Sequence, residues 1–158
     1  MLNLITNEQM RLADQFTIQH QPIDSVDLME QAAKAFVEEF CIEITPNRNI
    51  IIVAGKGNNG GDGLAIARLL YRKGFQNLTV YILNVFSTES ENFKINKFRL
   101  KEARIKSQII HSINDFPPQL DVVIDAVLGT GFKKGLRPEL VDIFSYINTN
   151  SNQIISVD

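Results

Sequence analysis

Polar residues that could bind a ligand follow three apolar runs of the sequence. The first cluster, GKGNNGGDG, follows IIIVA and ends at Gly63. In the second, DAVLGTGFKKG, Asp125 closes the apolar run VVI, and the third is Asp158 after IISV. Side-chain amides offer both donors and acceptors to a neutral or cationic group. One aspartate at a strand end is often only a turn-former, but two beside an Asn-Asn turn favour a site.

Gly55, Gly57 and Gly60 spell the G-x-G-x-x-G pattern of dinucleotide-binding turns, yet two features argue against that function. Such sites carry a carboxylate about 20 residues later for a ribose hydroxyl, whereas the next apolar run here ends in Asn84. Asp62 also places a negative charge where a pyrophosphate would meet the helix N-terminus. An NAD-dependent dehydrogenase is therefore a weak alternative. The ordinary structural interpretation of Asp62 is the N-cap of a helix that starts with GLAIARLL.

The apolar runs that carry these residues alternate with helical patterns. Thr6 and Gln9 form a capping box that predicts a helix through about Gln19, and Ser25 opens a second amphipathic helix. From Asn49 onward, the strand-like runs IIIVAG, LTVYILNV, SQIIHS, DVVIDAVLG and QIISVD are separated by helices. Strands that are apolar on both faces predict a Rossmann-like three-layer α/β/α sandwich with a mostly parallel sheet, preceded by two N-terminal helices. Ligands of such sheets bind at the carboxyl ends of the strands.

Length and charge exclude several classes of protein. The chain of 158 residues predicts a single domain, 1–158, and 16 basic against 18 acidic residues give a net charge of −2. A chain with this net charge lacks the excess of basic residues that proteins use to bind nucleic acid or an anionic membrane. No apolar run approaches the ~20 residues of a membrane span, and no signal peptide is present, so we expect a cytoplasmic protein. The lone Cys41 lies in the apolar helical stretch AAKAFVEEFCIEI, and we expect it to be buried.

In combination, these motifs resemble the YjeF N-terminal domain family, whose enzymes are NAD(P)H-hydrate epimerases. The similarity rests on AGKGNNGGDGLAIARLL, followed about sixty residues later by VIDAVLGTGFKKGL and then by IISVD. The segments ITNEQMRLADQFTI and DLMEQAA resemble the two leading helices of the family. Lys56 departs from the pattern, because relatives often have proline at this variable position of the turn.

The resemblance implies a set of site residues. Asn59 and Asp125 would bind a potassium ion, the expected cofactor, since amide and carboxylate oxygens suit a large monovalent cation. Small residues after Asp125 would let backbone N–H groups approach phosphate oxygens. Lys133 and Lys134 could add positive charge there, but a solvated helix edge is the better explanation of both lysines. The implied substrate-binding residues are Asn58, Asn59, Gly60, Gly61, Asp62, Gly129, Thr130, Gly131, Phe132, Lys133, Lys134, Gly135 and Asp158.

The resemblance also implies a reaction, the interconversion of the R and S forms of NADHX and NADPHX. These damaged cofactors carry a hydroxyl at C6 of the nicotinamide ring, and inverting that carbon needs proton transfer at the hydroxyl. Asp158 matches the catalytic carboxylate of the family. The main alternative is a non-catalytic scaffold module that binds nucleotides or proteins, but the acidic and amide residues that a scaffold could lose are all present.

Relatives continue past this aspartate with an IPSG-like segment and further elements, whereas the sequence ends at Asp158. We therefore expect a domain truncated at its C-terminal end, with an NAD(P)H-hydrate dehydratase either fused to it or separate. The leading helix carries Met10, Phe16 and Ile18, which are apolar and favour a homodimer. Coverage of the protein's own core is the alternative for these three side chains.

Overall fold

The computed structural model describes residues 6–20, 23–129 and 135–157. In chain order the elements are α1 (Asn7–His20), α2 (Ser25–Glu43), β1 (Ile50–Ala54), α3 (Asn58–Arg72), β2 (Leu78–Leu83), α4 (Glu91–Glu102), β3 (Ser107–Ile110), the 3₁₀ helix η1 (Ile113–Asp115), β4 (Leu120–Ala126), α5 (Pro138–Asn150) and β5 (Ser151–Ser156). Both predicted leading helices and all five predicted strands are present.

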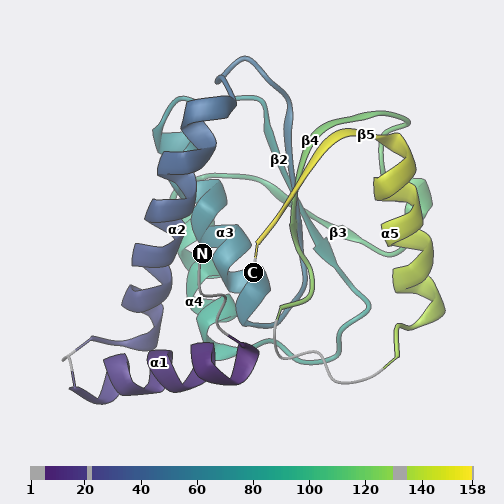
Figure 1. Ribbon diagram of the computed structural model, residues 1–158. Helices are drawn as coiled ribbons and strands as arrows, with labels where there is room; N and C mark the ends of the chain where they lie inside the picture. The colour runs from purple at the N-terminus through teal and green to yellow at the C-terminus, as the bar shows by residue number, and fades with distance from the viewer. Residues whose placement is uncertain (1–5, 21–22, 130–134, 158) are drawn as a thin grey trace.

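The five strands form one parallel sheet in the order β3-β2-β1-β4-β5. Helices α2, α3 and α4 cover one face and α5 covers the other, as Figure 1 shows, so the predicted three-layer α/β/α fold is confirmed. The order in which strands are added to the sheet reverses at β1. Strands β2 and β3 lie on one side of β1, and β4 and β5 lie on the other. Such a topological switch point is where ligands bind in open parallel sheets.

The core consists of two apolar layers, one on each face of the sheet. Successive side chains of a strand point to opposite faces. Ile50 and Ile52 therefore pack in the layer under α2, α3 and α4, whereas Ile51 and Val53 pack in the layer under α5. The two edge strands are more exposed, because each is paired on one side only.

Helix α2 corrects the expectation for Cys41, which is exposed. The helix buries Met29, Ala33, Val37 and Phe40, a stripe with the spacing of one helical face. Each residue turns the helix by about 100°, so the position after Phe40 faces away from the core.

The first helix begins as the sequence predicts. The N–H of Thr6 donates to Oε1 of Gln9 at 2.7 Å, and the N–H of Gln9 donates to Oγ1 of Thr6 at 3.3 Å, which completes the capping box. In Figure 1, α1 lies below α2, on the side to which the carboxyl ends of the strands point. Met10, Leu12 and Phe16 are 42%, 59% and 62% exposed on α1, so these side chains do not cover the protein's own core.

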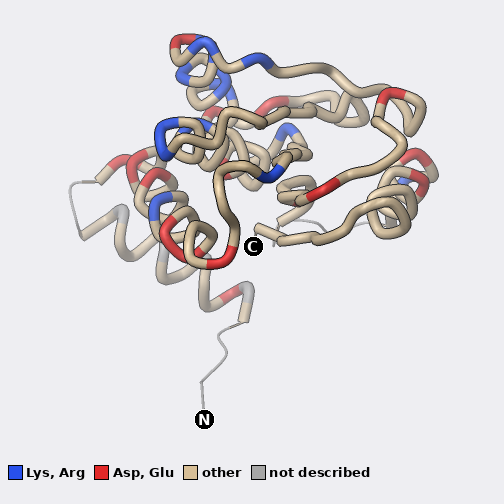
Figure 2. Tube along the Cα trace, turned by 90° about the horizontal axis from the view of Figure 1, so that it is seen from above, with Lys and Arg blue, Asp and Glu red and all other residues tan. Residues whose placement is uncertain are grey.

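Charged residues, coloured in Figure 2, lie almost entirely on helices and loops. Within the five strands, only Asp121 and Asp125 carry a charge, and both belong to β4. Among the described residues, no helix is long and apolar enough to cross a membrane.

Candidate active site

The carboxyl ends of β1 and β4 bring two of the predicted clusters together. Asn59, in the first turn of α3, donates from Nδ2 to the carbonyl oxygen of Leu128 at 2.9 Å. A Cβ added to Gly129 would lie 3.1 Å from Cβ of Asn59, so glycine allows the second cluster to lie directly against the first. The N–H of Gly55 donates to the carbonyl oxygen of Ala126 at 3.0 Å and extends the strand pairing into the turn.

The glycine-rich segment is mostly helical, which corrects the expectation for Asp62. Helix α3 begins at Asn58 with Gly57 as its N-cap, so Asp62 lies inside the helix and is not its N-cap. A Cβ on Gly60 would collide with the carbonyl oxygen of Gly55, and one on Gly63 would lie 2.6 Å from Cβ of Ala126. These glycines let α3 start in close contact with β1 and β4. Close packing, rather than turn formation, explains their occurrence.

This correction changes the electrostatic argument against an anion. The first intrahelical hydrogen bond runs from the N–H of Gly61 to the carbonyl of Gly57 at 3.1 Å. The N–H groups of Asn58, Asn59 and Gly60 therefore have no acceptor inside the helix, as in any helical first turn. Asp62 lies about one turn further along, so the positive end of the helix dipole is open to a phosphate.

Asp125 is the half-buried carboxylate of the site. It pairs in register with Val53 of β1 and Ser156 of β5, and its Oδ1 accepts a hydrogen bond from the N–H of Val127 at 3.0 Å. Burial raises the pKa of Asp125, an effect that the Val127 hydrogen bond only partly opposes. No described residue forms an ion pair with it. A buried anion of this kind is stabilised by a nearby cation.

The donor atoms present fit an alkali cation better than a transition metal. Nδ2 of Asn59 is occupied by the Leu128 carbonyl, which leaves Oδ1 of the amide for a cation. The described residues contain no group of three His, Cys, Asp or Glu side chains that could hold a metal ion. Amide, backbone and single carboxylate oxygens are therefore the available ligands, a set that suits a hard monovalent cation.

Several predicted site residues lie outside the described part of the chain, namely Thr130, Gly131, Phe132, Lys133, Lys134 and Asp158. Gly135 and Asn58 are both exposed. The N–H of Val157 donates to the carbonyl oxygen of Asp125 at 2.9 Å, so β4 and β5 stay paired up to the residue before Asp158.

Sequence reasoning missed three polar residues at the same edge. Nζ of Lys56 donates to Oδ1 of Asn84 at 2.9 Å, and Nδ2 of Asn84 lies 3.4 Å from Nδ1 of His111. Asn84 follows β2 and His111 follows β3, just as Lys56 follows β1. Each of these residues comes shortly after an apolar run, which places it at the end of a strand. That they lie side by side follows only from the strand order, which the sequence does not give.

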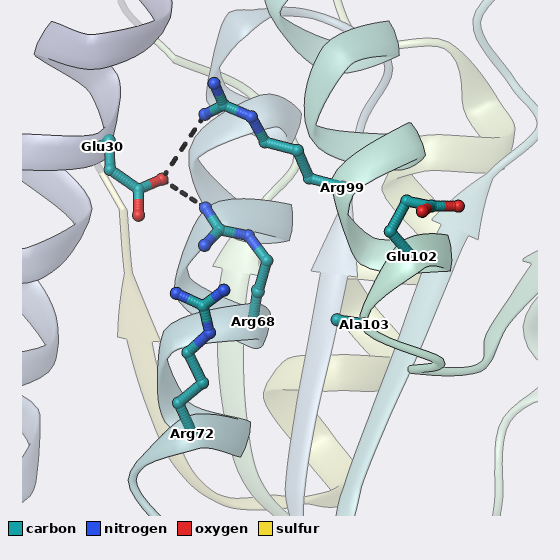
Figure 3. Close-up of a pocket in the computed structure, with 6 residues that line it drawn as sticks. All are labelled: Glu30, Arg68, Arg72, Arg99, Glu102 and Ala103. Atoms are coloured by element: carbon teal, nitrogen blue, oxygen red, sulfur yellow. Dashed lines mark hydrogen bonds and ion pairs between the residues drawn. The ribbon is translucent and has the colours of Figure 1, made fainter.

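Two surface pockets lie elsewhere and contain none of the predicted site residues. One, of about 480 Å³, lies between α2, α3 and α4. Figure 3 shows Arg68 and Arg99 pointing toward Glu30 there; the first forms a hydrogen-bonded ion pair with it and the second lies 3.8 Å away. These ion pairs join three helices. The other pocket, of about 660 Å³, lies at the amino ends of the strands and includes Asp121.

Comparison with known proteins agrees with this arrangement. A family model described as YjeF-related protein N-terminus matches residues 25–158. A bifunctional NAD(P)H-hydrate repair enzyme of Dictyoglomus turgidum is 32% identical over 160 residues, which cover 99% of this chain and 31% of that protein. An NAD(P)H-hydrate epimerase of Limosilactobacillus fermentum is 34% identical over 157 residues, which cover 98% of this chain and 72% of that protein.

A solved structure supports the fold independently. The crystal structure of a yeast protein, YNL200c, superposes with a TM-score of 0.81 at 23% sequence identity, over 99% of this chain and 70% of that one. The chain thus spans about a third of the bifunctional relative and about seven tenths of the other two proteins. With a family model that covers most of its length and epimerase relatives more than 30% identical, this chain belongs to the family of YjeF-related protein N-termini.

Proposed function

We propose that this chain is an NAD(P)H-hydrate epimerase, which interconverts the R and S forms of NADHX and NADPHX. The observation that carries the proposal is the packing of Asn59 against Leu128 and Gly129, in the segment that follows Asp125, at the switch point between β1 and β4. Relatives named NAD(P)H-hydrate epimerase align over nearly the whole chain, which supports the same conclusion.

The start of α3 would bind the pyrophosphate of the substrate. The N–H groups of Asn58, Asn59 and Gly60 are free of intrahelical acceptors, and an anion there is also favoured by the helix dipole. Backbone N–H groups around Gly129 would approach the same phosphates. The hydrated nicotinamide would then lie toward β4 and β5, on the side of the site that carries the carboxylates.

Asp158 would exchange a proton with the C6 hydroxyl, first as base and then as acid, so that the carbon can invert. Asn59 and Asp125 would hold a potassium ion through oxygen atoms, and the bound ion would offset the buried charge of Asp125. Because Asp125 is half-buried and lacks an ion-pair partner among the described residues, its carboxylate is suited to that role.

The proposal is tested by incubating the protein with purified S-NADHX and with R-NADHX in potassium buffer and separating the epimers by chromatography. The measured quantity is the enzyme-dependent rate above the spontaneous interconversion. An epimerase brings both starting materials to the same mixture at a rate proportional to protein concentration. A rate equal to the background with both epimers of NADHX and NADPHX would contradict the proposal.

We also propose that the protein forms a homodimer through α1. This helix exposes Leu12 and Phe16, which lie four residues apart and therefore on one face. The side chain of Ile18 lies outside the described part of the structure, so Met10 and Phe16 are the two originally expected contacts that the structure describes.

A further inference from the structure

Beyond the reaction itself, the carboxyl edge of the sheet carries a polar row made of Lys56, Asn84 and His111. The three side chains follow three adjacent strands, β1, β2 and β3, in that spatial order. Nζ of Lys56 contacts Oδ1 of Asn84 at 2.9 Å, and Nδ2 of Asn84 lies 3.4 Å from Nδ1 of His111. The row begins in the glycine-rich turn and continues away from Asp125.

The contacts within the row engage Oδ1 of Asn84 and Nδ1 of His111, and other N–H donors of the row are left for a ligand. Oδ1 of Asn84 accepts from Lys56, and Nδ2 of Asn84 faces Nδ1 of His111 at 3.4 Å; in the tautomer that accepts this contact, the ring N–H is on Nε2. Lys56 has further N–H donors and a positive charge. The row therefore presents N–H groups from lysine and histidine to an external ligand, a set that matches an oxyanion such as a phosphate.

The carboxylates near the row are already engaged. Oδ2 of Asp115 accepts the backbone N–H groups of His111 and Ser112, at 2.8 and 3.1 Å. Glu89 forms an ion pair with Lys97 at 2.7 Å. A second cation lies on the other side of the loop that follows β2, where Nη1 of Arg137 donates to the carbonyl oxygen of Val85 at 2.6 Å.

The spacing of the sheet relates the row to the substrate. Adjacent strands lie about 4.8 Å apart, so the ends of β5 and β2 are separated by roughly 14 Å across β4 and β1. A dinucleotide with its nicotinamide near β4 and β5 and its pyrophosphate at α3 would therefore reach β2 with its adenosine half. In dinucleotide sites the residue after the second strand contacts the ribose 2′ position, where a carboxylate selects NAD and a cation selects NADP.

We propose that Lys56, Asn84 and His111 bind the 2′-phosphate of NADPHX and make the enzyme prefer NADPHX over NADHX. The inference rests on the proposed function for its substrate, but the binding of a 2′-phosphate can be measured without any turnover. Asn84 stands where an NAD-selective site has a carboxylate, and Lys56 supplies the cation. This assigns a role to Lys56 of the glycine-rich motif.

Binding is measured by calorimetry on the full-length protein with adenosine 2′,5′-bisphosphate and with adenosine 5′-monophosphate. We expect the bisphosphate to bind about tenfold more tightly, the scale of one charge-assisted contact. Lys56→Ala and Asn84→Asp should each reduce that ratio to about threefold or less, the first by removing the cation and the second by adding a repelling carboxylate. Lys101→Ala, which removes one positive charge from the exposed end of α4, should leave the ratio unchanged.

The same variants are then compared by the ratio of kcat/KM for NADPHX to that for NADHX. The ratio should exceed 1 in the wild-type protein and fall by about threefold or more in Lys56→Ala, as the binding ratio does. Equal binding of the two adenosine phosphates by the wild type, or a ratio that neither variant changes, would overturn the inference even if epimerisation is observed. If instead the bisphosphate binds more tightly than the monophosphate in a way that depends on the row, and no epimerisation occurs, the proposed function is wrong but the inferred phosphate site is supported.

Discussion

Two aspartates of one strand, Asp121 and Asp125, have opposite electrostatic surroundings. Nε and Nη2 of Arg48 donate to the two oxygens of Asp121 at 2.8 and 2.6 Å, and this bidentate contact holds the pKa of Asp121 well below its usual range. Burial instead raises the pKa of Asp125. Asp121 joins the start of β4 to the segment before β1 and is structural. Asp125 has no such partner among the described residues and is the carboxylate proposed here as a cation ligand.

The contrast gives a pH prediction for Asp121→Asn. Because the folded pKa of Asp121 is depressed, its contribution to stability is present above the unfolded value of ~3.9 and is lost as the pH falls toward the folded pKa. The side chain of Arg48 is 37% exposed, so solvent screens the ion pair and the loss of stability in the variant at pH 7 should be small. Urea denaturation at pH 7 and pH 3 measures it.

At pH 3 the difference in the free energy of unfolding between the wild type and Asp121→Asn should be smaller than at pH 7. Asp142→Asn, which alters an exposed carboxylate on α5, is the matched control and should be close to wild type at both values. A gap that is equal at pH 7 and pH 3 would show that the Arg48 contact does not stabilise the charged form.

For Asp158, the expected result of substitution by asparagine is a loss of turnover without a loss of stability. The amide is nearly isosteric, but it cannot exchange the proton, and removing a general acid–base group costs ~10²–10⁴ in rate. The assay is epimer interconversion in a full-length protein, with thermal denaturation as the measure of folding. If Asp158→Asn kept more than about a tenth of the wild-type kcat, another group would have to perform the proton transfer.

The proposed potassium site is tested by diffraction. A crystal of the full-length protein soaked in rubidium should give an anomalous peak between Oδ1 of Asn59 and the Asp125 carboxylate, because rubidium replaces potassium with the same ligand chemistry. Asp125→Asn removes the negative charge and should weaken that peak. Full rubidium exchange without a peak at these residues would exclude the site.

At the scale of elements, helix α3 shows where sequence reasoning failed. Because glycines are poor helix formers, the sequence predicts a turn for GNNGGDG and a helix that starts after Asp62. The structure extends the helix back to Asn58, and its first turns pack so closely against Gly55 and Ala126 that a side chain at Gly60 or Gly63 has no room. Tertiary packing overrode local propensity, and a single sequence does not reveal that packing.

Gly63→Ala is therefore expected to destabilise the protein even though alanine favours helices. The new methyl group would lie 2.6 Å from Cβ of Ala126, between a helix and a strand that are both buried, and overpacking of this kind costs about 1–3 kcal/mol. Gly135→Ala is the control, since among the described residues no atom beyond its chain neighbours lies within 4 Å of the added Cβ. Equal midpoints of chemical denaturation for both variants would contradict the close-packing explanation.

At the scale of the whole molecule, the sequence predicted the elements and their order but not their neighbours. Periodicity placed the five strands, and the convergence of Asn59 with the segment after Asp125 followed from their positions at strand ends. The row of Lys56, Asn84 and His111 was not predicted, because nothing in the sequence shows that β1, β2 and β3 are adjacent. Strand pairing is a property of the complete sheet, and so is any site that spans several strands.

Assembly is also decided at this scale, and α1 is the element on which the proposed dimer would depend. Leu12 and Phe16 are 59% and 62% exposed, so burying them against a second copy of the chain would remove apolar surface from water. Leu12→Glu with Phe16→Glu should shift the protein from dimer to monomer in sedimentation velocity at high micromolar concentration, because two buried charges per subunit would have no partner.

The control for the dimer is Ile42→Glu, which alters a 75% exposed side chain near the end of α2. In Figure 1 that end of α2 is the one farther from α1, so the substitution should leave the dimer intact. Circular dichroism would verify that the α1 variant keeps its fold. A wild-type protein that sediments as a monomer throughout the concentration series, or a double variant that remains dimeric, would rule out pairing through α1.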